Sequence, residues 1–383
     1  MNNSSSPSDY KIGQDNVTPF GLDIHNPVFL ISGLSILVFV LITLMFQTQS
    51  AEFFAWLRPA ITSTFDWLFL SAGNIFVLFA VVVCISPLGR VRLGGQEASP
   101  DYSYIGWFSM LFAAGMGIGL MFFGVSEPMS HFGASMGGIT LGENGIRTDW
   151  APLGAAAGDV NAAKNLAMAA TIYHWGLHPW AMYAVVALAL AFFSFNHKLP
   201  LTLRSAFYPL LGERVWGWPG HLIDIIAVFA TLFGLATSLG FGTQQALAGF
   251  SYLYDWGTGS VAIVVLITFI SAIAIASVIR GLDGGVKLLS ELNMALALIL
   301  LAFIFLVGPT KDIITTLFSS ATAYITEFIP LSMPFGREDT NFSQGWTSFY
   351  WAWWISWSPF VGMFIARVSW GRTVREFLIC VIL

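Results

Sequence analysis

Long apolar runs separated by polar loops fill the sequence from residue 27 onward, and two of the loops, at 125–165 and 308–345, are long. Each run is near or above the roughly 20 residues that a helix needs to cross the hydrocarbon core of a bilayer. A further run starts at Phe377 and continues to Leu383, so we expect the chain to be truncated inside a ninth span. The pattern predicts eight complete membrane-spanning segments, at residues 27–46, 68–86, 105–124, 166–195, 223–249, 261–279, 288–307 and 346–368.

Composition agrees with this pattern. Hydrophobic residues make up 56% of the chain and charged residues 10%, and the mean hydropathy is +0.74. This balance excludes a soluble domain and predicts an all-α polytopic membrane protein whose main surroundings are the lipid bilayer. The net charge of −5 is too small to bear on a nucleic-acid partner, and none is expected because the chain has no basic tract. Cys84 and Cys380 both lie in apolar runs and indicate neither a disulfide framework nor a metal cluster.

The distribution of charge predicts an orientation. Residues 1–25 are polar, without a basic start and an apolar core, so we expect a disordered cytoplasmic tail rather than a signal peptide. With the N-terminus inside, eleven of the sixteen Lys and Arg residues lie in cytoplasmic loops and five lie outside, as the positive-inside rule requires. We therefore expect a multi-pass protein of the plasma membrane, the inner membrane in a bacterium. Residues 313–328 are amphipathic and are expected to lie along the outer surface.

One aromatic run stands out in the last complete span. Trp353, Trp354 and Trp357 fall within an arc of about 100° on a helix, so their rings project to one side. Pro359 follows them and predicts a break in the helix. Indole rings facing inward beside a helix break can hold an organic cation at membrane depth. The alternative is an aromatic belt at the lipid headgroups.

The third span contains glycines at alternate positions, around Met116. These glycines do not form a nucleotide-binding motif, because no strand precedes them and no acidic residue follows to bind a ribose. Glycine is a poor helix former, so the backbone can unwind here and expose its polar groups to a cavity; a close helix–helix contact is the alternative. The span interrupted at Pro359 lies five spans later and runs in the opposite direction. Paired broken helices of opposite direction indicate an inverted-repeat transporter. The glycines are Gly115, Gly117 and Gly119.

The fourth span supplies a second set of aromatic residues. Trp175, Trp180 and Tyr183 lie at helical angles of about 0°, 140° and 80°, so they fan across one face. Pro179 is expected to kink this helix and let the rings converge.

Two further features have competing interpretations. His174 and His178 have the i, i+4 spacing of a metal pair, but a third ligand and an HExxH motif are lacking, which favours structural histidines. Glu127-Pro128 is expected to end the third span outside, as a helix stop rather than a proton site.

The sequence resembles the betaine/choline/carnitine transporter family, BCCT, from about Asn26 to its end. The resemblance rests on the Gly-Met-Gly-Ile-Gly segment, the Trp-x4-Trp-x2-Tyr set and residues 353–375 (WWISWSPFVGMFIARVSWGRTVR). It implies a leucine-transporter-type core of two inverted five-helix repeats preceded by two extra helices, and commonly a homotrimer. The implied parts are a tail at 1–25, two peripheral helices at 26–102, the first repeat at 103–310, an outer amphipathic helix and loop at 311–344, and an incomplete second repeat at 345–383.

The resemblance also implies roles for particular residues. The substrate box falls on Trp175, Trp180, Tyr183 and Trp354, with Trp353 and Trp357 along the path, while Met116 and Gly115–Gly119 meet the substrate carboxylate. One sodium ion would bind the backbone of Ala113 and Met116. A second would use Thr231 and Phe360, but Leu235 stands where the family has a threonine. Apart from this coupling Na⁺, no cofactor is expected.

The resemblance and the residues that carry it lead to an expected function. The absence of aspartate at Gly119, which choline-selective members carry, favours a zwitterion such as glycine betaine. We expect a sodium symporter that works by alternating access, and not an enzyme. Choline, carnitine, ectoine and dimethylsulfoniopropionate stay open as substrates. A membrane enzyme acting on quaternary amines would reveal itself by product formation, and a channel or sensor by ion current without substrate accumulation.

Overall fold

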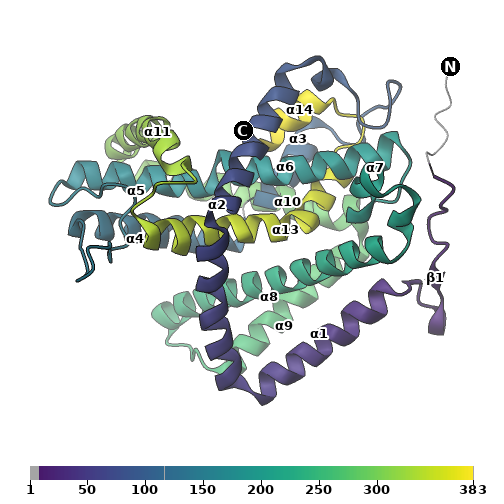
Figure 1. Ribbon diagram of the computed structural model, residues 1–383, viewed down its shortest axis with the longest axis horizontal. Helices are drawn as coiled ribbons and strands as arrows, with labels where there is room; N and C mark the ends of the chain where they lie inside the picture. The colour runs from purple at the N-terminus through teal and green to yellow at the C-terminus, as the bar shows by residue number, and fades with distance from the viewer. Residues whose placement is uncertain (1–7, 116, 383) are drawn as a thin grey trace. The chain divides into compact units, whose positions relative to one another are not determined.

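The computed structural model describes residues 8–115 and 117–382, without the side chains of Ile118 and Asp283 (Figure 1). Within these residues, six helices are long and apolar enough to cross a membrane, or seven spans if one bent helix pair is counted. Strand structure in the described part is a short hairpin, β1 (Asn16–Val17) paired with β2 (Ile24–His25). The prediction of an all-α polytopic membrane protein is confirmed.

The chain forms two compact units, each assembled from separate stretches of sequence. The first unit comprises Met1–Asp101, His178–Gly234 and Ser348–Leu383. Its helices are α1 (Val28–Met45), α2 (Gln47–Ile85), η2 (Pro87–Arg90), α6 (Leu177–Ala191), η3 (Phe192–Asn196), η4 (Leu203–Phe207), α7 (Tyr208–Leu211), η5 (Gly212–Trp216), the first half of α8 (Trp218–Tyr254), α13 (Phe349–Val368) and α14 (Val374–Ile382).

The second unit comprises Tyr102–Leu177 and Leu235–Thr347. In it α5 packs against both α4 and α11, and α3 packs against α10. The amphipathic segment expected at 313–328 forms the middle of α11. The helices of this unit are α3 (Tyr104–Gly115), α4 (Ile118–Gly137), α5 (Val160–Trp175), the second half of α8, α9 (Ser260–Ile279), η6 (Leu282–Val286), α10 (Lys287–Val307), α11 (Thr310–Ser332), α12 (Thr340–Phe342) and η7 (Ser343–Ser348).

Glycines set the close contacts of α13 in the first unit. A Cβ on Gly73 of α2 would lie 2.6 Å from the indole nitrogen of Trp351, and Trp351 is fully buried. A Cβ on Gly362 would lie 3.1 Å from a methyl group of Val186 on α6. Small residues that let helix backbones approach are the usual basis of helix packing in lipid. These contacts fix α13 against both α2 and α6.

The N-terminal segment differs from the predicted disordered tail over residues 8–25, which form the hairpin and pack on the first unit; residues 1–7 lie outside the described part. The guanidinium of Arg204 on η4 donates to the Tyr10 hydroxyl at 3.2 Å and to Nε2 of His25 at 2.9 Å. It also forms an ion pair with Asp224 at 3.1 Å. The ring of Tyr10 stacks on Trp216 with centroids 4.2 Å apart. A buried arginine therefore holds a segment that its composition alone suggested was unstructured.

The predicted break at Pro359 is wrong, because α13 continues through it from residue 349 to 368. Proline cannot donate to the carbonyl four residues earlier, which here belongs to Ile355. The hydroxyl of Ser358 donates to that carbonyl at 2.7 Å and satisfies it. The irregular backbone lies instead before α13, in the π-helical turn η7.

The predicted kink at Pro179 is also wrong. The helix breaks earlier, at Gly176, which has φ −95° and ψ −122° and ends α5. Pro179 then falls in the first turn of α6, where the missing N–H costs little. The expected helix stop at Pro128 is wrong as well, since α4 continues through it to Gly137.

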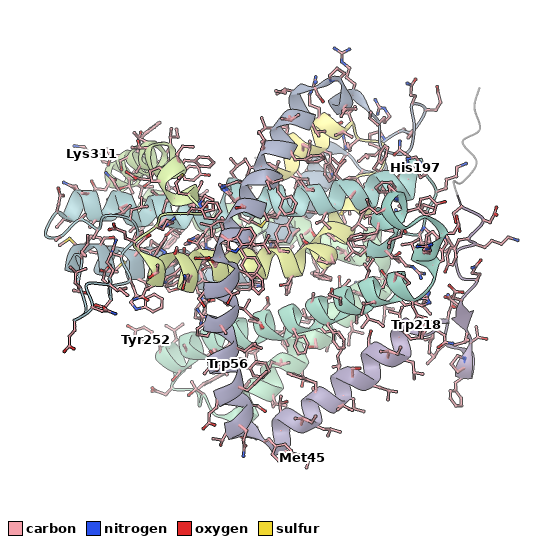
Figure 2. All side chains as sticks on the ribbon, in the orientation of Figure 1. Met45, Trp56, His197, Trp218, Tyr252 and Lys311 are labelled. Carbon is pink, nitrogen blue, oxygen red and sulfur yellow. The ribbon has the colours of Figure 1, made fainter. Side chains whose placement is uncertain are left out.

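Large apolar side chains cover much of the outer surface. Met45, Trp56 and Trp218, which Figure 2 labels, have 73%, 63% and 66% of their surface exposed. A soluble protein rarely exposes so many such side chains. This surface suits a lipid environment.

Candidate substrate and ion sites

The third span is broken at its glycines, as the sequence predicted. The helices α3 and α4 meet at an angle of 55°. Gly117 between them has extended backbone, with φ −102° and ψ −176°. Among the described residues, no neighbouring atom would lie within 4 Å of a Cβ on Gly117, so close helix packing does not explain it. Gly115 ends α3 and Gly119 lies in the first turn of α4, while Met116 lies outside the described residues.

Three of the four predicted box residues form one cluster in the first unit. The rings of Tyr183 and Trp354 form a T-shaped pair with centroids 6.0 Å apart at 75°, and those of Trp180 and Tyr183 form another at 5.7 Å and 74°. Trp354 also stacks on Trp353 at 5.1 Å and on Tyr350 at 5.7 Å. Trp354 is 7% exposed and Tyr183 is 5% exposed. An aromatic belt at the headgroups is therefore the wrong interpretation for Trp354.

Trp357 contributes to a different part of the same unit. A Cβ on Gly234 would lie 2.0 Å from its ring, so this tryptophan fills the space that the glycine leaves on α8. Trp357 also meets Phe360 edge-on, with centroids 5.5 Å apart. Its ring is half-buried and packs beside α8, apart from the cluster around Trp354.

Thr231 and Phe360 line one pocket of about 430 Å³ in the first unit. The Thr231 hydroxyl donates to the Ala227 carbonyl at 2.8 Å. The pocket also contains Asp224, but its carboxylate is engaged by Arg204. Sodium requires several oxygen ligands, and these side chains supply few that are uncommitted. The geometry fits a second sodium ion poorly. Ala113 lies in α3 of the second unit and is half-buried.

Trp175 belongs to the second unit, at the C-terminal end of α5. The helical angles predicted for Trp175, Trp180 and Tyr183 required one continuous helix. Trp175 instead ends α5, whereas Trp180 and Tyr183 lie in α6. The indole N–H of Trp175 donates to Oε2 of Glu127 at 2.6 Å. Its ring also lies 6.1 Å from that of Phe123, tilted by 35°.

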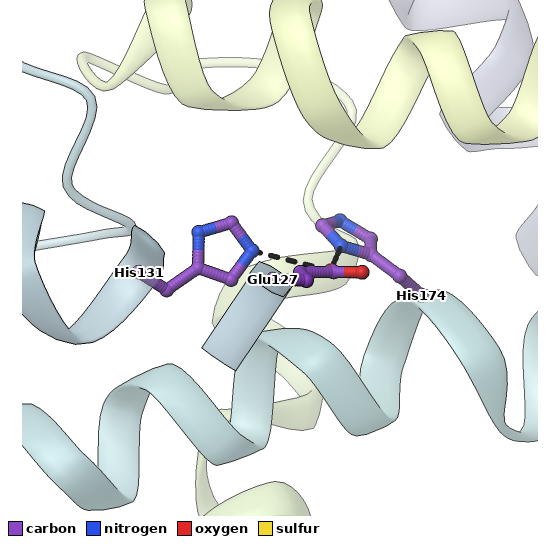
Figure 3. A group of neighbouring side chains, drawn as sticks. All are labelled: Glu127, His131 and His174. Carbon is purple, nitrogen blue, oxygen red and sulfur yellow. Dashed lines mark hydrogen bonds and ion pairs between the residues drawn. The ribbon is translucent and has the colours of Figure 1, made fainter. Parts of the chain in front are cut away.

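Glu127 is the centre of a buried polar cluster that the sequence did not predict (Figure 3). Its Oε1 lies 2.6 Å from Nδ1 of His174 and 3.2 Å from Nε2 of His131. Nε2 of His174 lies 2.9 Å from the Thr347 hydroxyl. The side chains of Glu127, His131 and His174 are at most 1% exposed. The i, i+4 spacing of Glu127 and His131 in an apolar helix was the available signal, since it places both on one face.

Two imidazoles and a carboxylate are also the ligand types of zinc. Zinc ligands at about 2.0–2.1 Å in tetrahedral geometry are separated by about 3.3 Å. The 2.6 Å between Glu127 and His174 is instead a charge-assisted hydrogen-bond length. An ionised carboxylate only accepts, so His174 donates from Nδ1 and can accept from Thr347 at Nε2. The cluster is a hydrogen-bond network.

His174 and His178 belong to different units and have different partners. His178 lies in the first unit, where its Nε2 is 3.0 Å from the Asn74 side-chain oxygen. Its ring stacks on Trp351 with centroids 5.5 Å apart. Each histidine therefore has its own hydrogen-bond partner, which agrees with the prediction of structural histidines.

An all-helical polytopic fold with a helix broken inside a span and a buried aromatic cluster is typical of membrane transport proteins. The model of the betaine/carnitine/choline transporter family, BCCT, matches residues 27–383, and the chain belongs to that family. Members of this family are transporters rather than enzymes.

Several Vibrio parahaemolyticus proteins are similar over nearly the whole chain. A glycine betaine/proline/choline transporter is 64% identical over 98% of this chain and 68% of its own length. A glycine betaine transporter is 52% identical over 99% of this chain and 70% of its own length. A glycine betaine/proline/choline/ectoine transporter is 53% identical over 99% of this chain and 65% of its own length.

Proposed function

We propose that the protein is a sodium-coupled symporter that imports glycine betaine across the bacterial inner membrane by alternating access. The buried contact between Tyr183 and Trp354 carries the proposal. A trimethylammonium group cannot donate hydrogen bonds, so aromatic faces are its natural partners, at about 0.5–2 kcal/mol each. Trp180, Tyr183 and Trp354 would bind that group, with Trp175 as a further aromatic partner. Trp353 and Trp357 would line its path.

The break between α3 and α4 supports a role in binding the other end of the substrate. Backbone amides freed at Gly117 and at the start of α4 can donate to a carboxylate, and a helix N-terminus favours negative charge. This suits a zwitterion, and Gly119 adds no acidic group to compete with its carboxylate. Sodium would bind at the end of α3, near Ala113. The residues around Thr231 give little support for a second ion.

The charge of the substrate is the reason to propose coupling to sodium. A zwitterion carries no net charge, so the membrane potential does no work on it alone. Each Na⁺ that crosses with it adds about 2.3 kcal/mol per 100 mV, roughly a fiftyfold concentration gradient. We propose a leucine-transporter-type pair of inverted repeats, a homotrimer and a cytoplasmic N-terminus, all from the family resemblance. The names of two Vibrio relatives include choline, and one of them includes ectoine, so we keep both as alternative substrates. Carnitine and dimethylsulfoniopropionate stay as alternatives from the family resemblance alone.

Uptake of labelled glycine betaine into proteoliposomes tests the proposal. We expect accumulation with an inward sodium gradient and little without one, and competition by choline, carnitine or dimethylsulfoniopropionate ranks the substrates. Trp354→Ala should raise KM by about 2- to 30-fold, the loss of one ring. Trp56→Ala, at an exposed position, is the matched control and should leave KM unchanged. Sodium-independent uptake overturns the coupling, and an unchanged KM in Trp354→Ala overturns the cage.

A further inference from the structure

Glu127 and Trp175 are joined by a short hydrogen bond whose function the transport proposal does not explain. The carboxylate accepts from the indole N–H through Oε2 and from the two imidazoles through Oε1. The two carboxylate oxygens thus accept from different partners. Oε1 ties Glu127 to its own helix and to α5, whereas Oε2 holds the ring of Trp175.

The network leaves Glu127 little freedom. His131 lies one turn further along α4, and His174 precedes Trp175 directly on α5. The contact from His174 to Thr347 anchors the network to η7 as well. A carboxylate held by three donors in a buried site has a fixed position, and so has the indole that donates to it.

The charge of the carboxylate also acts on the ring. A hydrogen bond from an N–H to an anion shifts electron density into the aromatic system, and the face of that system attracts cations. This effect favours a cationic group on Trp175 over a neutral group of the same shape.

We propose that Glu127 is the positioning residue of Trp175, and that its negative charge makes this indole a stronger partner for a quaternary ammonium group. The inference rests on the proposed function, in which Trp175 contacts the substrate. It adds a charged residue that acts through the indole without touching the substrate itself.

A double-mutant cycle on full-length protein in proteoliposomes tests this role, with the KM for labelled glycine betaine as the readout. Glu127→Gln removes the charge and keeps an oxygen that can accept from Trp175, while His174 can change tautomer. We expect it to raise KM by about 3- to 30-fold. Trp175→Phe keeps a ring and removes the N–H, and should raise KM similarly. In the Trp175→Phe background, Glu127→Gln should add less than about twofold, because the two act as one unit.

His131→Gln is the matched control, because glutamine can still donate to Oε1 and because His174 and Trp175 keep their contacts with the carboxylate. We expect it to change KM by less than about threefold while lowering thermal stability. Equal effects of His131→Gln and Glu127→Gln on KM would show that the network has only a structural role. Additive effects of Glu127→Gln and Trp175→Phe on KM would show that the carboxylate acts independently of the indole. Either result overturns the inference. If Glu127→Gln does not fold, an unchanged KM in Trp175→Phe alone overturns it.

The proposed function fails in a different way. If wild-type protein takes up no glycine betaine, both proposals fall. If Trp354→Ala raises KM while Glu127→Gln does not, the cage stands and the role of Glu127 is refuted.

Discussion

Replacing Gly234 by alanine should destabilise the first unit and disturb Trp357. The added Cβ would lie 2.0 Å from one carbon of the indole and 2.3 Å from the next. Carbon atoms pack at about 3.5–4.0 Å, so ring and helix must separate by about 1.5 Å. Trp357 also forms a T-shaped contact with Phe360, with centroids 5.5 Å apart, so a shift of the indole disturbs this contact as well.

The size of the destabilisation follows from two opposing free-energy contributions. Overpacking of this kind costs about 1–3 kcal/mol. Alanine is the better helix former by about 1 kcal/mol, which offsets part of that cost. We therefore expect a net destabilisation of up to about 2 kcal/mol. For domains of 150–250 residues, 1 kcal/mol lowers Tm by about 2–4 °C.

Gly240→Ala on the same helix is the matched control. Among the described residues, no neighbouring atom would lie within 4 Å of its Cβ, so only the gain in helix propensity remains. Thermal unfolding of purified protein in detergent should show a lower Tm for Gly234→Ala and an equal or higher Tm for Gly240→Ala. Equal shifts in both variants would refute the packing of Trp357 on α8.

Three further predictions concern a proline, a loop and the N-terminal segment. Ser358→Ala should cost about 1–3 kcal/mol, because it leaves the Ile355 carbonyl without its hydroxyl donor, and Ser356→Ala, exposed on the same helix, should have a smaller effect on Tm. Burial would raise the pKa of Asp149, but hydrogen bonds from Arg147 and from backbone amides outweigh this and lower it to about 2 from 3.8. Its stabilisation is therefore present above pH 4 and lost toward pH 2, so the Tm difference between wild type and Asp149→Asn should close in that range. Burial and Arg204 lower the pKa of His25 below 6.5, so acidification below that pH should loosen residues 8–25. We expect their hydrogen-exchange protection factors, which correct for the intrinsic pH dependence of exchange, to be lower at pH 5.5 than at pH 7.5, and equal protection factors would contradict this.

Apolar runs and their lengths predicted most of the helical architecture. The first span matches α1 within two residues, and the sixth and seventh match α9 and α10 within one. These segments are recognised from composition because lipid requires a long apolar helix whatever its neighbours are. The break after Gly115 was predicted for the same kind of reason, since glycines interrupt a helix locally.

The polar cluster around Glu127 could not be predicted from periodicity. Glu127 and His174 are 47 residues apart, and their contact depends on how α4 packs against α5. Periodicity places Glu127 and His131 on one face but does not identify the opposite helix. The docking of residues 8–25 likewise depends on Arg204, far along the chain.

The prolines show how neighbours decide the effect of one residue. Pro179 follows Gly176, which already ends a helix, so the proline begins the next helix instead of bending the first. Pro359 follows Ser358, whose hydroxyl takes the carbonyl that the proline leaves, so α13 continues. In lipid, an unsatisfied carbonyl costs more than in water, and a substitute donor determines whether the helix can continue. A proline in a membrane span therefore predicts a break only after the donors beside it have been considered.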